Sequence, residues 1–112
     1  MKKVRVAGVN YTITLGKDSR TLIHDKNVMP PGFVWGALHY QSTEIGIFDG
    51  PNKDVTRVSA YHEIVHAILE GYHIHQMMDE DDKHIEDSVD LMAVALHEVM
   101  NSLGFDILKA IK

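Results

Sequence analysis

The sequence predicts an α+β fold in which a small antiparallel sheet of two β-hairpins packs on two long helices. Residues 3–15 and 33–48 alternate between apolar and polar or small side chains, which is the two-residue period of half-buried strands. Residues 55–69 and 82–103 instead repeat apolar side chains every three or four positions, as helices do when they pack by one face. Residues that favour turns separate these stretches.

Length and composition predict a single soluble domain over residues 1–112, which leaves no room for a separate substrate-binding domain. The net charge of -5 gives no reason to expect nucleic acid as a partner. The chain has no cysteine, which excludes disulfides and thiolate zinc sites. No apolar run has the length of a membrane span or the character of a signal peptide, so we expect a cytoplasmic protein.

Each hairpin has its own turn signal. The first turn is expected at Ala7–Asn10, where Gly and Asn tolerate positive φ. The second hairpin is expected to pair Phe33–Tyr40 with Glu44–Phe48. Trp35 is expected in the core of this hairpin rather than in contact with a substrate. Between the hairpins the signals are weaker, and His24 is interpreted as a loop residue rather than a metal ligand.

The first helix is expected to begin after the turn at Asp49–Asn52 and to end at Gly71. Its expected apolar face comprises Val55, Val58, His62, Val65 and Leu69. The second helix is expected from about Asp82 to Ser102, with Gly104 ending it. Its expected apolar face comprises Ile85, Val89, Met92, Leu96, Val99 and Leu103. His97 is interpreted as structural or exposed.

The first helix carries the motif His62-Glu63-x-x-His66. Side chains four residues apart lie on the same face of a helix, so both imidazoles can bind one Zn²⁺. Glu63 is then placed to act on a zinc-bound water rather than to bind the metal. The alternative is a helix with two ordinary histidines. The uncharged residues around the motif, from Ile64 to Ile68, favour a helix buried behind a metal site.

This motif resembles the active-site helix of the zincin metallopeptidases. Downstream, Glu86 and Asp90 repeat a four-residue spacing, and Glu86 follows His66 by twenty positions, which resembles the thermolysin-like gluzincins. That resemblance implies that Glu86 is the third zinc ligand and that Asp90 accepts a hydrogen bond from His62. It covers residues 59–96, and the short chain is most similar to compact metallopeptidases of phages and mobile elements. Taken alone, both carboxylates could equally be a solvated acidic helix start.

Three histidines compete with Glu86 for the place of third ligand: His73, His75 and His84. A metzincin-like arrangement needs a glycine three residues after His66 and a histidine six residues after it. Leu69 and Tyr72 occupy those positions, so the chain lacks the glycine that would turn it back to the metal. We therefore expect Glu86, which lies on a helix of its own beside Asp90, to complete the site.

The expected function is zinc-dependent hydrolysis of a peptide bond, with one Zn²⁺ per chain and Glu63 as general base. Mn, Co or Ni could occupy the same ligands in vitro. One alternative is a zinc-containing regulatory or binding module with little turnover that needs a partner protein, and another is a purely structural zinc site. A peptide substrate could add along Glu44–Phe48 if that strand is a sheet edge rather than an inner strand. No residue is assigned to stabilise the transition state.

Overall fold

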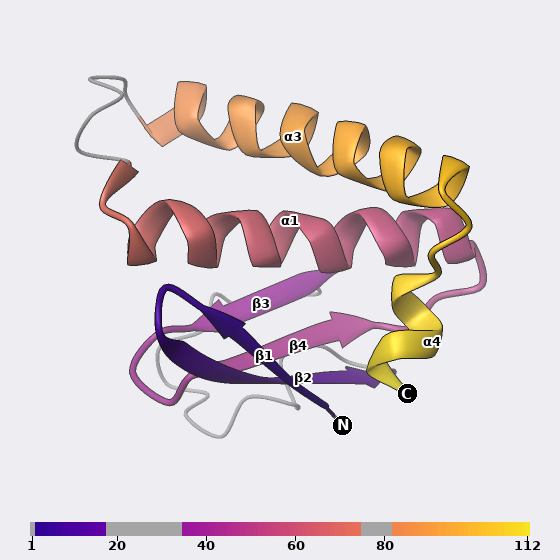
Figure 1. Cartoon of the computed structure of the whole chain (residues 1–112), viewed down its shortest axis with the longest axis horizontal. Helices are drawn as coiled ribbons and strands as arrows, with labels where there is room; N and C mark the ends of the chain where they lie inside the picture. Colours follow the sequence, from indigo (N-terminus) through magenta and orange to yellow (C-terminus); the bar gives the residue numbers. More distant parts are fainter. Residues whose placement is uncertain (1, 18–34, 75–81) are drawn as a thin grey trace.

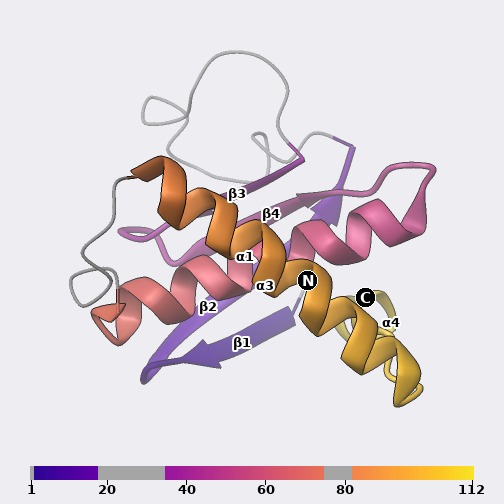
Figure 2. The same ribbon diagram turned by 90° about the horizontal axis from the view of Figure 1, so that it is seen from above.

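The computed structural model describes residues 2–17, 35–74 and 82–112, and it places them in three layers. A four-stranded sheet forms the first layer, helix α1 covers one face of it, and helix α3 lies on the outer side of α1 (Figure 1). Seen from above, α3 crosses over α1 and the sheet lies beneath both (Figure 2). The α+β fold class expected from the sequence is confirmed. The elements in chain order are β1 (Lys2–Val6), β2 (Val9–Gly16), β3 (Gly36–His39), β4 (Glu44–Phe48), α1 (Lys53–Gly71), α3 (Asp82–Ser102) and α4 (Ile107–Ile111).

Both hairpins form within the described residues. β1 and β2 pair in antiparallel fashion and are joined by Ala7 and Gly8, whose φ angles are 50° and 81°. Two positive φ angles define the turn whose twist suits a two-residue hairpin, so glycine is needed there. β3 and β4 also pair in antiparallel fashion, with Gly36 opposite Ile47 and His39 opposite Glu44.

The sheet is mixed, so the prediction of a wholly antiparallel sheet was wrong. Its strand order is β1-β2-β4-β3, and β2 runs parallel to β4. Hairpin turns fix only the pairing within each hairpin, and the long connection between the two allows either orientation. β4 is therefore an inner strand, which decides between the sheet edge and the inner strand that the sequence left open for Glu44–Phe48. Among the described strands, β3 is the edge on that side.

The core lies between the sheet and α1. Ile45 and Ile47 of β4 are 1% and 0% exposed, and Ala60 and Ala67 of α1 are fully buried in the same cluster. Burying an isoleucine side chain stabilises the fold by about 1.5–3 kcal/mol. Because alanine is small, α1 lies close enough to the sheet for side chains on that face of the helix to reach the strands.

The start of α1 is as predicted, whereas its end differs. Asn52 is the N-cap, and its side chain accepts hydrogen bonds from the backbone N–H groups of Asp54 and Val55. Gly71 is the last helical residue, and the positive φ angle falls at His73 instead. Gly71 is needed for packing, since a Cβ there would lie 2.6 Å from the Cβ of Ala7.

α3 has the predicted bounds, and Gly104 follows it with a φ of 81°. On the predicted apolar face, Val89 is fully buried and Ile85 is partly buried, but Val99 and Leu103 are more than half exposed. The predicted apolar face is therefore buried only in the N-terminal half of α3, since α1 is the single helix beneath it. No helix in the described ranges carries an apolar stretch long enough to cross a bilayer.

α4 was not predicted, because its five residues are too few to show a helical period. Asp106 caps it by accepting a hydrogen bond from the backbone N–H of Leu108 at 3.0 Å. The same carboxylate accepts hydrogen bonds from Nε and Nη2 of Arg57 on α1, at 3.1 and 3.2 Å. This bidentate pair fastens the C-terminal segment to the helix that carries the His-Glu-x-x-His motif.

Candidate metal centre

Two histidines of α1 form one side of the candidate centre. His62 and His66 lie one helical turn apart, and the centroids of their rings are 4.8 Å apart. Their side chains are 18% and 20% exposed, so both rings lie at the surface of α1 but are largely covered. The four-residue spacing thus brings the two imidazoles together, as the sequence predicted.

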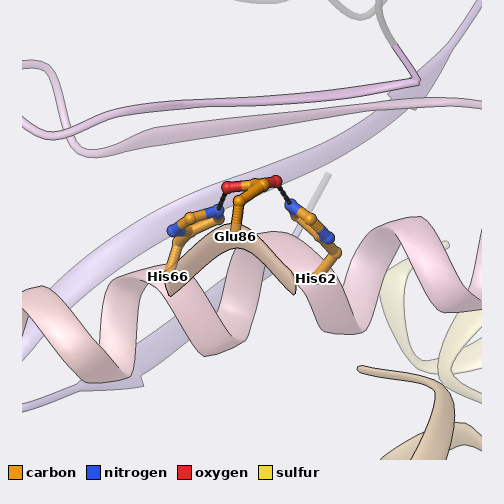
Figure 3. Close-up of side chains that lie close together, drawn as sticks. All are labelled: His62, His66 and Glu86. Atoms are coloured by element: carbon orange, nitrogen blue, oxygen red, sulfur yellow. Dashed lines mark ion pairs between the residues drawn. The ribbon is translucent and has the colours of Figure 1, made fainter. Parts of the chain in front are cut away.

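Glu86 reaches the two histidines from α3. Its Oε1 lies 2.8 Å from Nε2 of His62, and its Oε2 lies 3.0 Å from Nε2 of His66, so one carboxylate bridges both rings (Figure 3). The structure brings these three residues together from two helices, and their ligand atoms all lie within 4.8 Å of one another.

The apolar residues behind the centre fix the distance between the two helices. Three positions after each of His62, His66 and Glu86 stands a buried apolar residue. These residues form one cluster, which comprises Val65, Leu69 and Val89. Residues three apart are neighbours on a helix surface. Packing of this cluster therefore holds α1 and α3 at the separation that the two imidazoles and the carboxylate need.

The geometry suits a metal ion. Two imidazole nitrogens and one carboxylate are the protein ligands of many catalytic zinc sites. At Zn–N and Zn–O distances near 2.1 Å, tetrahedral ligand atoms lie about 3.4 Å apart. The ligand atoms here lie within 4.8 Å of one another, so small side-chain rotations would close the site.

Asp90 lies on the far side of His62. Its Oδ1 is 2.8 Å from Nδ1 of His62, while Nε2 of the same ring faces Glu86. An Nδ1–H that donates to a carboxylate leaves the lone pair of Nε2 for a metal and makes the imidazole a better ligand. The spatial relation expected for Asp90 is therefore present, although its side chain is 60% exposed.

Glu63 is buried beside the centre without belonging to the bridging group. It is 9% exposed, and within the described residues its carboxylate has no hydrogen bond. Burial, assisted by the negative charge of Glu86, raises the pKa of Glu63 to about 8. A buried carboxylate without a hydrogen-bond donor is uncommon and needs an explanation, which catalysis can supply.

The start of β3 holds the Glu63 side chain in place. A Cβ built on Gly36 would lie 3.0 Å from Cγ and 3.1 Å from Oε1 of Glu63. Any residue larger than glycine would thus displace the carboxylate. This contact could not be predicted from the sequence, because it depends on how a strand and a helix pack whose residues are 27 positions apart.

An open cleft of about 450 Å³ adjoins the centre. It is lined by Trp35, Gly36, Asp54, Val55, Val58, Ser59, His62, Glu63 and Asp90. Trp35 is 50% exposed, so its predicted place in the core was wrong. It precedes the first residue of β3 and contacts Phe48 edge-on, at the end of the sheet and not within it.

Within the described residues, no further histidine joins the centre. His73 is exposed beyond the end of α1, and neither it nor His84 belongs to the group of potential ligands found among the described residues. His24 and His75 lie outside the described residues. His97 contacts Tyr61 and lies 3.4 Å from Asp54, in agreement with a structural role.

Tyr40 is a polar residue near the centre that the sequence analysis missed. Its hydroxyl donates to the backbone carbonyl of His66 at 3.4 Å. Burial raises the pKa of Tyr40, and carboxylates that include Glu63 and Glu86 add to the effect, so the phenol keeps its proton. It sits just after β3, and only the pairing of β3 with β4 brings it over α1.

Comparison of the chain with protein-family models, with curated proteins and with solved structures gives no match. What this centre does must therefore be inferred from its own residues.

Proposed function

We propose that the protein is a zinc-dependent peptidase in which His62, His66 and Glu86 hold the metal and Glu63 is the general base. The observation that carries the proposal is the buried Glu63 carboxylate, which has no hydrogen bond within the described residues and lies beside the bridging group. A charged cluster that served only to join two helices would have no use for such a group, because burying it lowers stability.

When bound, zinc supplies Lewis-acid polarisation of a carbonyl and acidification of water. Glu63 would accept the proton of the attacking water on a carboxylate oxygen and then deliver it to the leaving amine. Burial raises the pKa of this carboxyl, which strengthens it as a base, and the positive charge of a bound metal will lower that pKa again. Asp90 would keep the His62 ring oriented throughout.

An open cleft supports catalysis over a purely structural zinc site. Structural zinc sites have four protein ligands, whereas the described residues bring three together here. The cleft lined by His62 and Glu63 gives a substrate access to the fourth position. We propose that an extended peptide adds beside β3, because Glu44–Phe48, the strand considered from the sequence, lies inside the sheet. The cytoplasmic location also stays a prediction.

A second candidate is a zinc-containing binding module with little turnover that acts with a partner protein. The exposed apolar side chains of α3, which include Leu91, Val94 and Val99, favour it because such surfaces often mark protein contacts. The two candidates differ in one property, which is whether the isolated chain cleaves peptides.

The deciding experiment combines metal analysis with cleavage of a peptide library by the zinc-loaded protein. We expect one Zn²⁺ per chain, cleavage by the wild type, and loss of cleavage in Glu63→Gln with zinc content unchanged. Glu98→Gln makes the same chemical change at an exposed position of α3 outside the cleft and should stay active. Unchanged zinc content in His62→Ala would refute the metal site. A wild type that binds zinc but cleaves nothing would favour the binding module.

A further inference from the structure

The cleft beside the centre has the size and place of a pocket for one substrate side chain. Its volume is about 450 Å³, within the range of small-ligand sites. It is continuous with the centre, since His62, Glu63 and Asp90 belong to its lining. A side chain bound there would therefore flank the bond that Glu63 helps to cleave.

One wall of the cleft is apolar and belongs to α1. Val55 and Val58 lie three residues apart and His62 four residues further on, so all three share a helix face. Both valines belong to the apolar face expected for this helix, and both are only partly buried and line the cleft. This wall runs from the first turn of α1 to the metal ligands and can cover an aliphatic chain several carbons long.

The charged residues of the lining are all acidic. Asp54 and Asp90 are 74% and 60% exposed, Glu63 is buried, and no lysine or arginine belongs to the lining that the described residues form. The contacts of Asp54 with Arg57 and His97 and that of Asp90 with His62 all use Oδ1. The Oδ2 atom of each aspartate can therefore accept a hydrogen bond from a ligand.

We infer that the cleft binds a basic substrate side chain, lysine or arginine, with its aliphatic stem on Val55 and Val58 and its cationic end at Asp54. The role of this side chain in cleavage rests on the proposed function, whereas its binding in the cleft does not. Long basic side chains bury their stems on apolar surface while the charge stays in water, which suits an apolar wall with an exposed carboxylate at its far end. A neutral aliphatic side chain would use the wall alone, and an acidic one would meet carboxylates.

Trp35 gives a direct measurement of binding that needs no catalysis. It is the single tryptophan of the chain and it lines the cleft, so its fluorescence reports on ligands there. Zinc-loaded and zinc-free protein would each be titrated with the blocked amino acids Nα-acetyl-arginine amide, Nα-acetyl-norleucine amide and Nα-acetyl-glutamate amide. The norleucine compound has an unbranched aliphatic side chain like the stem of lysine or arginine, but it carries no charge.

We expect the arginine compound to bind about three- to fivefold more tightly than the norleucine compound, as exposed ion pairs allow, and the glutamate compound to bind least. Asp54→Asn should remove the advantage of arginine, and Glu98→Gln, an exposed control outside the lining, should keep it. Equal or tighter binding of norleucine, an advantage that survives in Asp54→Asn, or no binding at all would overturn the inference.

A cleavage assay separates this inference from the proposed function. Matched peptides would carry arginine, norleucine or glutamate next to the scissile bond. A fluorescence preference for arginine without any cleavage would refute the peptidase and leave the basic pocket standing. Cleavage without preference for arginine would leave the peptidase standing and refute the pocket.

Discussion

Replacing Asp90 by Asn tests whether the contact between this carboxylate and His62 supports metal binding. The 2.8 Å contact between Oδ1 and Nδ1 is the single route by which Asp90 reaches a candidate ligand in the described structure. Loss of such supporting contacts lowers metal affinity by about 10–100-fold, or about 1.4–2.7 kcal/mol. Because Asp90 is 60% exposed and water weakens its interactions, we expect a value near tenfold. Asn keeps an acceptor oxygen and loses only the charge, so Asp90→Ala should weaken zinc further.

Two measurements check this expectation. Competition with a chromophoric chelator gives the zinc affinity of each variant. Thermal unfolding at a fixed excess of free zinc should show the same loss of stabilisation, and about 1.4 kcal/mol corresponds to a decrease in Tm of about 6 °C for a domain of this size. Without zinc, the variant should lose less than about 1 kcal/mol, because the Asp90 carboxylate is largely exposed and its contact is weakened by water.

Asp87→Asn is the matched control. Asp87 is exposed on the same helix, one residue after Glu86, and the change removes the same charge. It should leave zinc affinity within about twofold of the wild type, because exposed charges interact weakly through water. Equal affinities for Asp90→Asn and the wild type, or equal losses in Asp90→Asn and Asp87→Asn, would show that the contact with His62 does not support the metal.

Three further predictions follow from contacts in the structure. Glu86→Ala should lose most zinc affinity while His84→Ala keeps it, and metal analysis showing the opposite would reassign the third ligand. Gly36→Ala should lower kcat by displacing Glu63 while zinc content stays unchanged, and an unaltered kcat would show that the carboxylate can move freely. Hydrogen bonds from Arg57 lower the pKa of Asp106 below its ordinary value of 3.8. The pair therefore contributes its full stabilisation above pH 3.8, and this contribution is lost as the pH falls through the lowered pKa. Asp106→Asn should therefore lower the urea midpoint at pH 7, and the difference from wild type should shrink in acid; a constant difference would refute the ionic contribution.

The two long helices and the pairing of the two histidines could be predicted from the sequence because both depend on local spacing. A four-residue interval places His62 and His66 on one face whatever lies around them, and the bounds of α3 follow from its apolar period and from Gly104. Local spacing does not predict that Glu86 faces both histidines, because that contact also requires α1 and α3 to pack in the correct register. The resemblance to gluzincins provided that prediction, and the cluster of Val65, Leu69 and Val89 shows how the packing achieves this contact.

The order of the sheet could not be predicted in the same way, and that order determines the surroundings of the proposed base. A glycine in a strand often marks a close approach of another group, and Gly46 of β4 and Gly36 of β3 are both strand glycines. Because β4 lies between β2 and β3, Gly46 is on an inner strand, and the close approach to Glu63 occurs at Gly36 of the edge strand β3. The same strand order leaves Trp35 at the end of the sheet beside the cleft. The strand that lies at the edge of the sheet therefore determines which residues surround Glu63. Strand order is a long-range property, and the alternation of apolar side chains does not encode it.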